Sequence, residues 1–170
     1  TQCLAFSVDK GRQWSKFSDN PVVDWIEGDN RDPKVIWHAA SQHWVMALYL
    51  ADDRYALLVS KNAQKWERTQ ELTLEADTEC PDFFPLSDES GAERWVFWSA
   101  SGRYVIGSFD GKIFTPETGM LVCERGYNGY AAQTWSNAPN GRCVQISWMA
   151  GGLYPEMPFN QQMSIPVELK

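Results

Sequence analysis

Val59-Ser60-Lys61-Asn62-Ala63-Gln64-Lys65-Trp66 is the stretch that decides the fold, because variants of it occur at three places along the chain. Residues 6–14 (Phe-Ser-Val-Asp-Lys-Gly-Arg-Gln-Trp) form an earlier copy, and residues 107–114 (Gly-Ser-Phe-Asp-Gly-Lys-Ile-Phe) form a fainter later one. Each copy runs from an apolar segment to a serine, crosses a turn rich in Asp, Asn, Gly or Ala, and ends on an aromatic residue, which is typical of a β-hairpin. A spacing of about 50 residues indicates propeller blades of four strands rather than helical repeats.

The segments between these copies also read as strands. Runs dominated by β-branched and aromatic residues occur at 35–37, 44–50, 94–98, 104–109 and 144–149. The stretch 65–74 has some helical character, but no window of the chain keeps an apolar period of 3.6 residues over three turns. We therefore predict an all-β fold built from four-stranded antiparallel sheets.

Two short acidic motifs stand at the same point of successive repeats. Arg31-Asp32-Pro33 precedes one set of strands and Glu79-Cys80-Pro81-Asp82 precedes the next, while residues 126–130 begin a further unit where one is due. Equivalent turns of a propeller point toward one axis, so the two carboxylates are expected to converge. A pair of facing carboxylates is the chemistry of a glycosidase.

The length sets the expected extent of the propeller. At about 50 residues per blade, a chain of 170 residues makes about three and a half blades, fewer than the four to eight of closed propellers. We expect one partial propeller over 1–170 with approximate units at 1–29, 30–77, 78–125 and 126–170. We also expect this chain to be a piece of a larger enzyme, or to be completed by another chain, with self-association through exposed blade edges.

The amino-acid composition narrows the classes of molecule that the chain is expected to bind. Hydrophobic residues make up 44% of the chain, nine of its residues are tryptophan, and the formal net charge is −7, which disfavours disorder and nucleic-acid binding. No apolar run approaches the roughly 20 residues of a membrane helix, and no signal peptide is visible. The four cysteines are scattered without a C-x-x-C pair, so we predict no metal and no cofactor.

The motifs in this order resemble glycoside hydrolase family 32, the levanases, invertases and inulinases. The resemblance covers Arg31-Asp32-Pro33, Glu79-Cys80, residues 4–14, residues 130–135 and the closing stretches 146–149 and 157–169. It implies a five-bladed β-propeller, of which this chain would be about three and a half blades. It also implies hydrolysis of β-fructosidic bonds in fructans or sucrose, and an extracellular or periplasmic parent enzyme.

The resemblance further implies roles for particular residues. Glu79 would be the general acid/base of a retaining displacement, and Asp32 would stabilise the transition state while held by Arg31. Cys80 would lie beside Glu79 as a small neighbour. For the donor role we expect the pKa of Glu79 to lie above its ordinary value, raised by nearby carboxylates and by aromatic desolvation.

Aromatic side chains complete the expected site and the expected core. Tyr130 and Trp148 would line the sugar pocket, although Asn128-Gly129 before Tyr130 departs from the family pattern. Trp14 and Trp66 lie at equivalent repeat positions and are predicted to pack within blades. We interpret the two histidines, His38 and His43, as structural or solvated.

One departure from the family pattern limits the prediction of catalytic activity. The family's nucleophile is an Asp in a Trp-Met-Asn-Asp-Pro-Asn motif, and no such string occurs in this sequence. We therefore expect the chain alone to be inactive. Two other interpretations stay open, a catalytically inactive carbohydrate-binding fragment and an interaction module that recruits partners through its blade edges. The family 43 arabinanases and xylosidases fit the Arg-Asp-Pro and Glu-Cys pair less well.

Overall fold

A computed structural model of the chain describes residues 1–123, 125–126 and 128–170, and its regular structure is almost entirely antiparallel strand. The first sheet contains β3 (Arg31–His38), β4 (His43–Ala51), β5 (Arg54–Ser60) and β6 (Glu67–Thr73), paired in chain order. The second contains β7 (Asp82–Ser87), β8 (Glu93–Trp98) and β9 (Arg103–Phe109), with β10 (Phe114–Pro116) and β11 (Leu121–Val122) both on β9.

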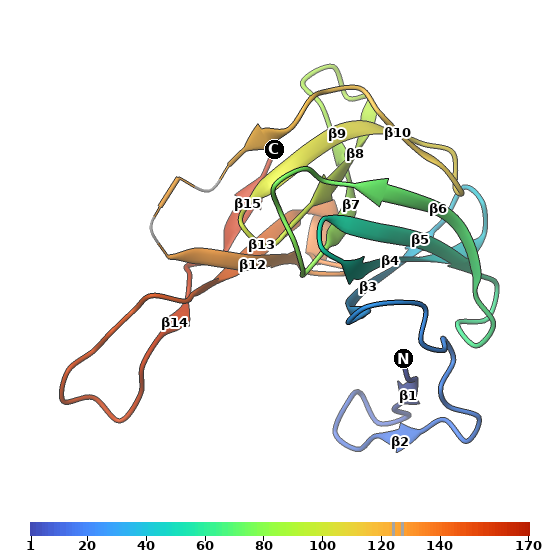
Figure 1. The fold of residues 1–170 in the computed structure, drawn as a ribbon, viewed down its shortest axis with the longest axis horizontal. Coiled ribbons are helices and arrows are strands. Elements are labelled where there is room, and N and C mark those ends of the chain that lie inside the picture. Colours follow the sequence, from blue (N-terminus) through green and yellow to red (C-terminus); the bar gives the residue numbers. More distant parts are fainter. Residues whose placement is uncertain (124, 127) are drawn as a thin grey trace.

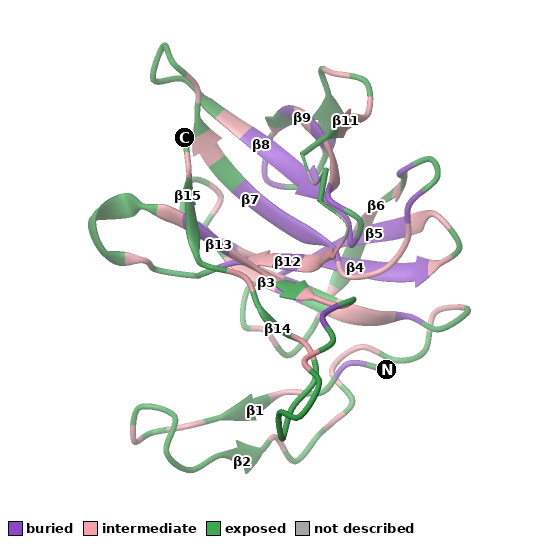
Figure 2. Ribbon diagram, turned by 90° about the vertical axis from the view of Figure 1, so that its left-hand side faces the viewer, coloured by how far each residue is buried: buried purple, intermediate pink, exposed green. Residues whose placement is uncertain are grey.

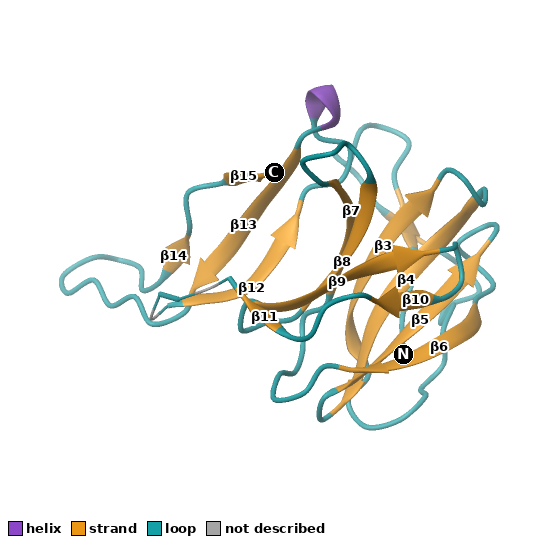
Figure 3. Cartoon of the chain, turned by 90° about the horizontal axis from the view of Figure 1, so that it is seen from above, coloured by secondary structure: helices purple, strands orange, loops and turns teal. Residues whose placement is uncertain are grey.

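The third sheet contains β12 (Gly129–Thr134) and β13 (Cys143–Met149), with β14 (Gln162–Met163) and β15 (Val167–Leu169) both on β13. A short 3₁₀ turn (Pro139–Gly141) joins β12 to β13, and β1 (Ala5–Phe6) pairs with β2 (Ser15–Lys16) in a separate hairpin. Within the described ranges, no helix is long and apolar enough to cross a membrane. Figure 3 shows the three sheets arranged one after another, as blades of a propeller are.

The predicted all-β, partial-propeller fold is confirmed. Strands were expected at 44–50, 94–98, 104–109 and 144–149, and β4, β8, β9 and β13 occupy those positions with small extensions. Within the stretch 65–74 the chain forms β6 (Glu67–Thr73) and no helix, as the lack of helical periodicity indicated. In the expected start of a further unit at 126–130, Tyr127 lies outside the described residues, and β12 begins at Gly129.

The core lies between neighbouring sheets. In β4 the residues Val45, Ala47 and Tyr49 pack against the second sheet, while Met46 and Leu48 pack on the opposite face against Val23 and Ile26 of the N-terminal segment. Because successive side chains of a strand point to opposite faces, burial on both faces requires the nearly continuous apolar run of this strand. Figure 2 shows this burial on β4, β7 and β8.

The repeated turns share one hydrogen-bonding arrangement. Asp9 Oδ1 accepts from the backbone N–H groups of Arg12 and Gln13, at 3.0 and 2.9 Å. Asn62 Oδ1 accepts in the same way from Gln64 and Lys65, and Asp110 Oδ1 from Lys112 and Ile113. A short side chain that caps its own turn explains why Asp or Asn recurs at this place in each copy.

The two repeat tryptophans differ in their surroundings. Both indole N–H groups donate to the carbonyl three residues earlier, at 3.0 Å. Trp66 packs against the core of the first sheet as predicted, but Trp14 is 65% exposed, so the prediction of blade packing was wrong for it. The reason is its position on the β1–β2 hairpin, which lies apart from the three sheets in Figure 1.

The two histidines are structural, as interpreted. His38 and His43 pair across the β3–β4 turn and are both buried. Ser41 Oγ bridges them, and His43 Nε2 donates to the Gly111 carbonyl at 2.6 Å. This network ties the first sheet to the second at the end of β3 that is remote from Arg31.

Candidate active site

The candidate site forms where the innermost strand of each sheet begins. The backbone has positive φ at Asp32 (59°), Glu79 (61°), Cys80 (42°) and Ala131 (51°), and the strand register shifts just after Arg31 and just after Tyr130. Non-glycine residues with positive φ are uncommon and gather at functional sites. Bulges of this kind turn side chains out of the regular strand alternation, and here they direct them toward one point.

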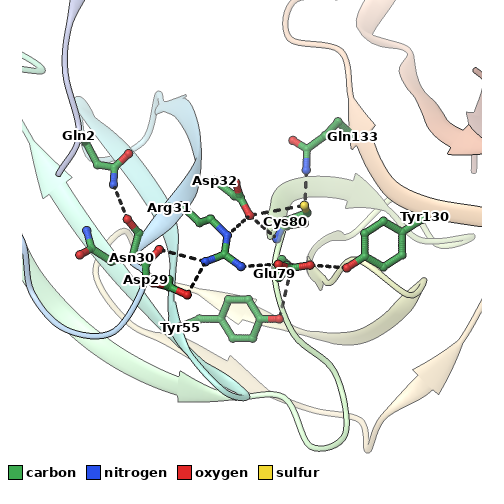
Figure 4. Close-up of polar contacts among 10 residues, drawn as sticks. All are labelled: Gln2, Asp29, Asn30, Arg31, Asp32, Tyr55, Glu79, Cys80, Tyr130 and Gln133. Carbon is green, nitrogen blue, oxygen red and sulfur yellow. Dashed lines mark hydrogen bonds and ion pairs between the residues drawn. The ribbon is translucent and has the colours of Figure 1, made fainter. Parts of the chain in front are cut away.

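Arg31 lies at the centre of the polar contacts (Figure 4). Its guanidinium forms an ion pair with Glu79 Oε1, and its Nε lies 3.6 Å from Asp32 Oδ2. Its Nη1 lies 3.2 Å from Asp29 Oδ2, and the guanidinium carbon lies 5.0 Å from the centre of the Tyr49 ring. The hydrogen bond to Glu79 raises the pKa of Arg31 further, so a fixed positive charge stands between the two predicted catalytic carboxylates.

Glu79 is held at both oxygens. Arg31 donates to Oε1 and the Tyr130 hydroxyl donates to Oε2. These contacts, with Tyr130 the larger contribution and Arg31 the next, lower the pKa of Glu79 below its ordinary value of 4.5. The expectation of a raised pKa was therefore wrong for this chain, because two donors to the ionised form outweigh the desolvation that acts in the opposite direction.

Cys80 contacts the other carboxylate. Its backbone N–H and its Sγ donate to Asp32 Oδ2 at 3.2 and 3.5 Å. Burial, reinforced by the charge of Asp32, raises the pKa of the Cys80 thiol to about 12. The thiol is therefore a neutral hydrogen-bond donor that orients Asp32, and it is not a nucleophile.

Tyr130 and Trp148 face each other across β12 and β13 in direct register. Their ring centroids lie 6.1 Å apart with planes at 72°, and Trp148 is 37% exposed. Tyr130 therefore belongs to the carboxylate cluster. Trp148 adjoins that cluster through the ring of Tyr130 and is partly exposed.

Several contact residues were missed by the sequence analysis as site residues. Gln133 donates to the carbonyl of Pro81 at 3.1 Å, and the Tyr55 hydroxyl donates to the carbonyl of Glu79 at 3.4 Å. Asp29 and Tyr49 flank Arg31. Gln133 could have been noted from its place three residues after Tyr130, whereas Tyr49 and Tyr55 read simply as core strand residues.

A buried ion pair lies next to the site. Lys34 Nζ lies 2.8 Å from Asp82 Oδ1 and donates to the Thr134 carbonyl at 2.7 Å. Thr134 in turn donates to Asp82 through its backbone N–H and its hydroxyl. Burial raises the pKa of Asp82, and Lys34 acts against that rise. These three residues join β3, β7 and β12, the strands that carry or follow the site residues.

No group of three or more His, Cys, Asp and Glu side chains suitable for a metal ion occurs among the residues that the structure describes. The four cysteines, Cys3, Cys80, Cys123 and Cys143, are free thiols.

Replacing Tyr130 with phenylalanine should raise the pKa of Glu79, because the larger of its two stabilising hydrogen bonds is lost. The folded-state pKa of Glu79 lies below the unfolded value, so its contacts stabilise the fold above about pH 4.5 and are lost as the pH falls through the folded-state pKa. The variant should therefore be less stable than wild type at pH 7, with a difference that shrinks in acid. Urea unfolding at several pH values measures this, with Tyr154→Phe on the β13–β14 loop as the control; an equal loss at every pH would contradict it.

Sequence comparisons with known proteins agree with the geometry of the candidate site. The levanase of Bacillus subtilis (strain 168) is 34% identical over 196 aligned residues, covering 99% of this chain and 29% of the levanase. The invertase of Wickerhamomyces anomalus is 30% identical over 176 residues, covering 91% of this chain and 32% of the invertase. The chain thus spans about a third of the length of these curated relatives.

Solved structures give the same result. A fructofuranosidase variant from Schwanniomyces occidentalis complexed with fructosylnystose superimposes with a TM-score of 0.89 at 25% identity, covering 98% of this chain and 36% of that one. The exo-inulinase of Aspergillus awamori gives a TM-score of 0.84 at 27% identity, covering 95% and 39%. Residues 1–170 also match the glycosyl hydrolases family 32 N-terminal domain. The chain therefore belongs to glycosyl hydrolase family 32.

Proposed function

We propose that this chain carries part of the active site of a β-fructosidase that hydrolyses β-fructosidic bonds in a fructan or in sucrose. The observation that supports this most strongly is the convergence of three parts of the chain. Asp32 on β3 and Glu79 just before β7 both contact the Arg31 guanidinium, and Tyr130 on β12 donates to Glu79. The levanase and invertase names of its relatives support the fructoside substrate.

In this proposal Glu79 donates a proton to the leaving oxygen and later takes one from water. Asp32 stays ionised and accepts hydrogen bonds from hydroxyls of the fructosyl group, which strengthen as positive charge develops on the sugar ring. Arg31 is held by both carboxylates and fixes their separation. Cys80 is a positioning residue for Asp32 through its N–H and S–H donors.

The nucleophile of the retaining mechanism is proposed to come from residues outside this chain. Retaining glycosidases place nucleophile and acid/base carboxyls about 5 Å apart. A carboxylate at that distance would raise the pKa of Glu79 by like-charge repulsion, against the lowering by Tyr130 and Arg31. The low pKa of Glu79 in this chain and its proposed role as a proton donor are thereby consistent.

The substrate would contact the aromatic side of the site. Tyr130 and Trp148 present ring faces on which sugar C–H surfaces can stack.

Relatives named extracellular exo-inulinases support an extracellular parent enzyme. Self-association through exposed blade edges remains a prediction, and a monomer in light scattering at high concentration would contradict it.

The test combines binding and turnover on the purified chain. Titration calorimetry should detect fructose binding that Asp32→Ala abolishes, and assays with sucrose, levan and inulin should show no fructose release from the chain or from Glu79→Gln. Release by the chain that Glu79→Gln abolishes would place the nucleophile within these residues. Absence of fructose binding would overturn the proposed site.

A further inference from the structure

A buried carboxylate stands two residues before Glu79 and is absent from the catalytic scheme above. Asp77 is 5% exposed and lies in the segment between β6 and β7. Its Oδ1 accepts from the Thr78 N–H at 2.8 Å and from the Ser101 hydroxyl at 2.8 Å, and its Oδ2 accepts from the Ser99 hydroxyl at 2.6 Å. A buried carboxylate is costly unless its oxygens are hydrogen-bonded, and here both are bonded to neutral donors.

Apart from the neighbouring Thr78 N–H, the partners of the Asp77 carboxylate lie on the turn between β8 and β9. The backbone N–H of Ser101 adds a longer contact to Oδ1 at 3.3 Å. The same turn supplies the Ala100 carbonyl, which accepts from the N–H of Ala131 at 2.8 Å, and Ala131 directly follows Tyr130. One turn therefore fixes the backbone next to Glu79 on one side and the backbone next to Tyr130 on the other.

We propose that Asp77 is a positioning residue that sets the Glu79–Tyr130 hydrogen bond by tying the Glu79 segment to the β8–β9 turn. The inference rests on the proposed role of Glu79 but concerns its geometry. Glu79 and Cys80 both have positive φ, at 61° and 42°. A backbone conformation of this kind persists only where surrounding contacts hold it in place. The bonds from Asp77 to the turn are contacts of this kind.

The turn does not depend on Asp77 for its own shape. The Ser99 N–H donates to the Arg103 carbonyl at 3.0 Å, and the Gly102 N–H donates to the Ser99 carbonyl at 3.1 Å. The Ser99 hydroxyl has a second acceptor in the Arg103 carbonyl at 3.1 Å. Removing the Asp77 carboxylate should therefore release the Glu79 segment and leave the turn and its contact with Ala131 in place.

Asp77 can affect the pKa of Glu79 in two opposite ways, through its own charge and through the position that it gives Glu79, and this makes the inference testable. Removing a nearby negative charge would by itself lower the pKa of Glu79, whereas losing the Tyr130 hydrogen bond would raise it. The charged and titratable groups around Glu79 are Arg31 and Asp32 on or beside β3, Tyr55 on β5, Tyr130 on β12, and Cys80 next to it.

The experiment is a carbon-13 NMR titration of the Glu79 carboxyl in the whole chain, with the resonance assigned by Glu79→Gln. Asp77→Ala should shift the Glu79 pKa upward, toward its ordinary value of 4.5. Asp77→Asn keeps the shape and a hydrogen-bonding network without the charge, so it should give no upward shift. The control is Asp88→Ala at the β7–β8 turn, where Asp88 Oδ1 likewise accepts from a serine hydroxyl at 2.6 Å and from backbone N–H groups.

A downward or zero shift in Asp77→Ala, or an upward shift equal to that in Asp88→Ala, would overturn the inference. If Asp77→Ala does not fold, Ser101→Ala removes one donor, keeps the Asp77 charge, and should still raise the Glu79 pKa relative to Asp88→Ala. The titration reads the geometry of Glu79 whether or not the chain binds fructose, so a failure here is distinct from a failure of the proposed function.

Discussion

Replacing Lys34 with methionine is expected to lower the free energy of unfolding by about 3–5 kcal/mol, the cost of leaving a buried charge without its partner. Asp82 is fully buried, and Lys34 is 9% exposed. The ammonium group lies 2.8 Å from Asp82 Oδ1 and 3.0 Å from the Thr134 hydroxyl. Methionine keeps the apolar stem but removes the positive charge that opposes protonation of Asp82.

The effect should be large because these contacts join three sheets. β3, β7 and β12 come from different parts of the sequence, and this network runs from each of them to the others. Loss of the Lys34 charge therefore weakens two boundaries between sheets at once. Urea denaturation followed by tryptophan fluorescence measures the loss.

Two controls separate burial from charge. Arg68→Ala removes an exposed ion pair, in which Arg68 lies 2.7 Å from Glu71, and should cost about 0–1 kcal/mol. The double variant Lys34→Met, Asp82→Leu removes both buried charges and should be more stable than Lys34→Met alone. A loss in Lys34→Met no larger than that in Arg68→Ala would show that the pair does not stabilise the boundaries between the sheets.

The sequence was sufficient to predict the fold class because the signals are local. The repeated turn carries its own caps, and the apolar runs mark strands buried on one or both faces. The exposure of Trp14 could not be read in this way, since its motif matches that of Trp66 and the difference lies in what each hairpin packs against. The Lys34–Asp82 pair was likewise invisible, because its partners are 48 residues apart and their pairing depends on how the sheets meet.

The site was predicted in part for a related reason. The acidic motifs identified Asp32 and Glu79 by their equivalent places in the repeat, and the structure brings both to Arg31. The direction of the Glu79 pKa was wrong because it depends on which donors reach each oxygen, and the donor Tyr130 comes from a different sheet. Asp77 gave no sequence signal, since a single Asp before a motif has no distinctive pattern.

Replacing Glu79 with glutamine is expected to lower kcat for fructose release by about 10²–10⁴-fold, which is the usual contribution of general acid–base catalysis. This holds for any polypeptide in which this chain forms part of a working active site. Glutamine preserves the size of the side chain and can still contact Arg31 and Tyr130, but it cannot deliver a proton. The loss should therefore appear in kcat with natural substrates such as sucrose, whose leaving oxygen must be protonated.

Comparing substrates with different leaving groups shows whether this loss in kcat reflects proton donation. A fructoside with a nitrophenol leaving group needs little protonation, so Glu79→Gln should slow formation of the enzyme-bound intermediate far less with that substrate than with sucrose. Asp32→Asn is the matched control, because a residue that stabilises charge on the sugar ring acts equally whichever group departs. If Glu79→Gln slowed both substrates to the same extent, Glu79 would be holding Arg31 and Tyr130 in place, and the proton donor would have to be another group.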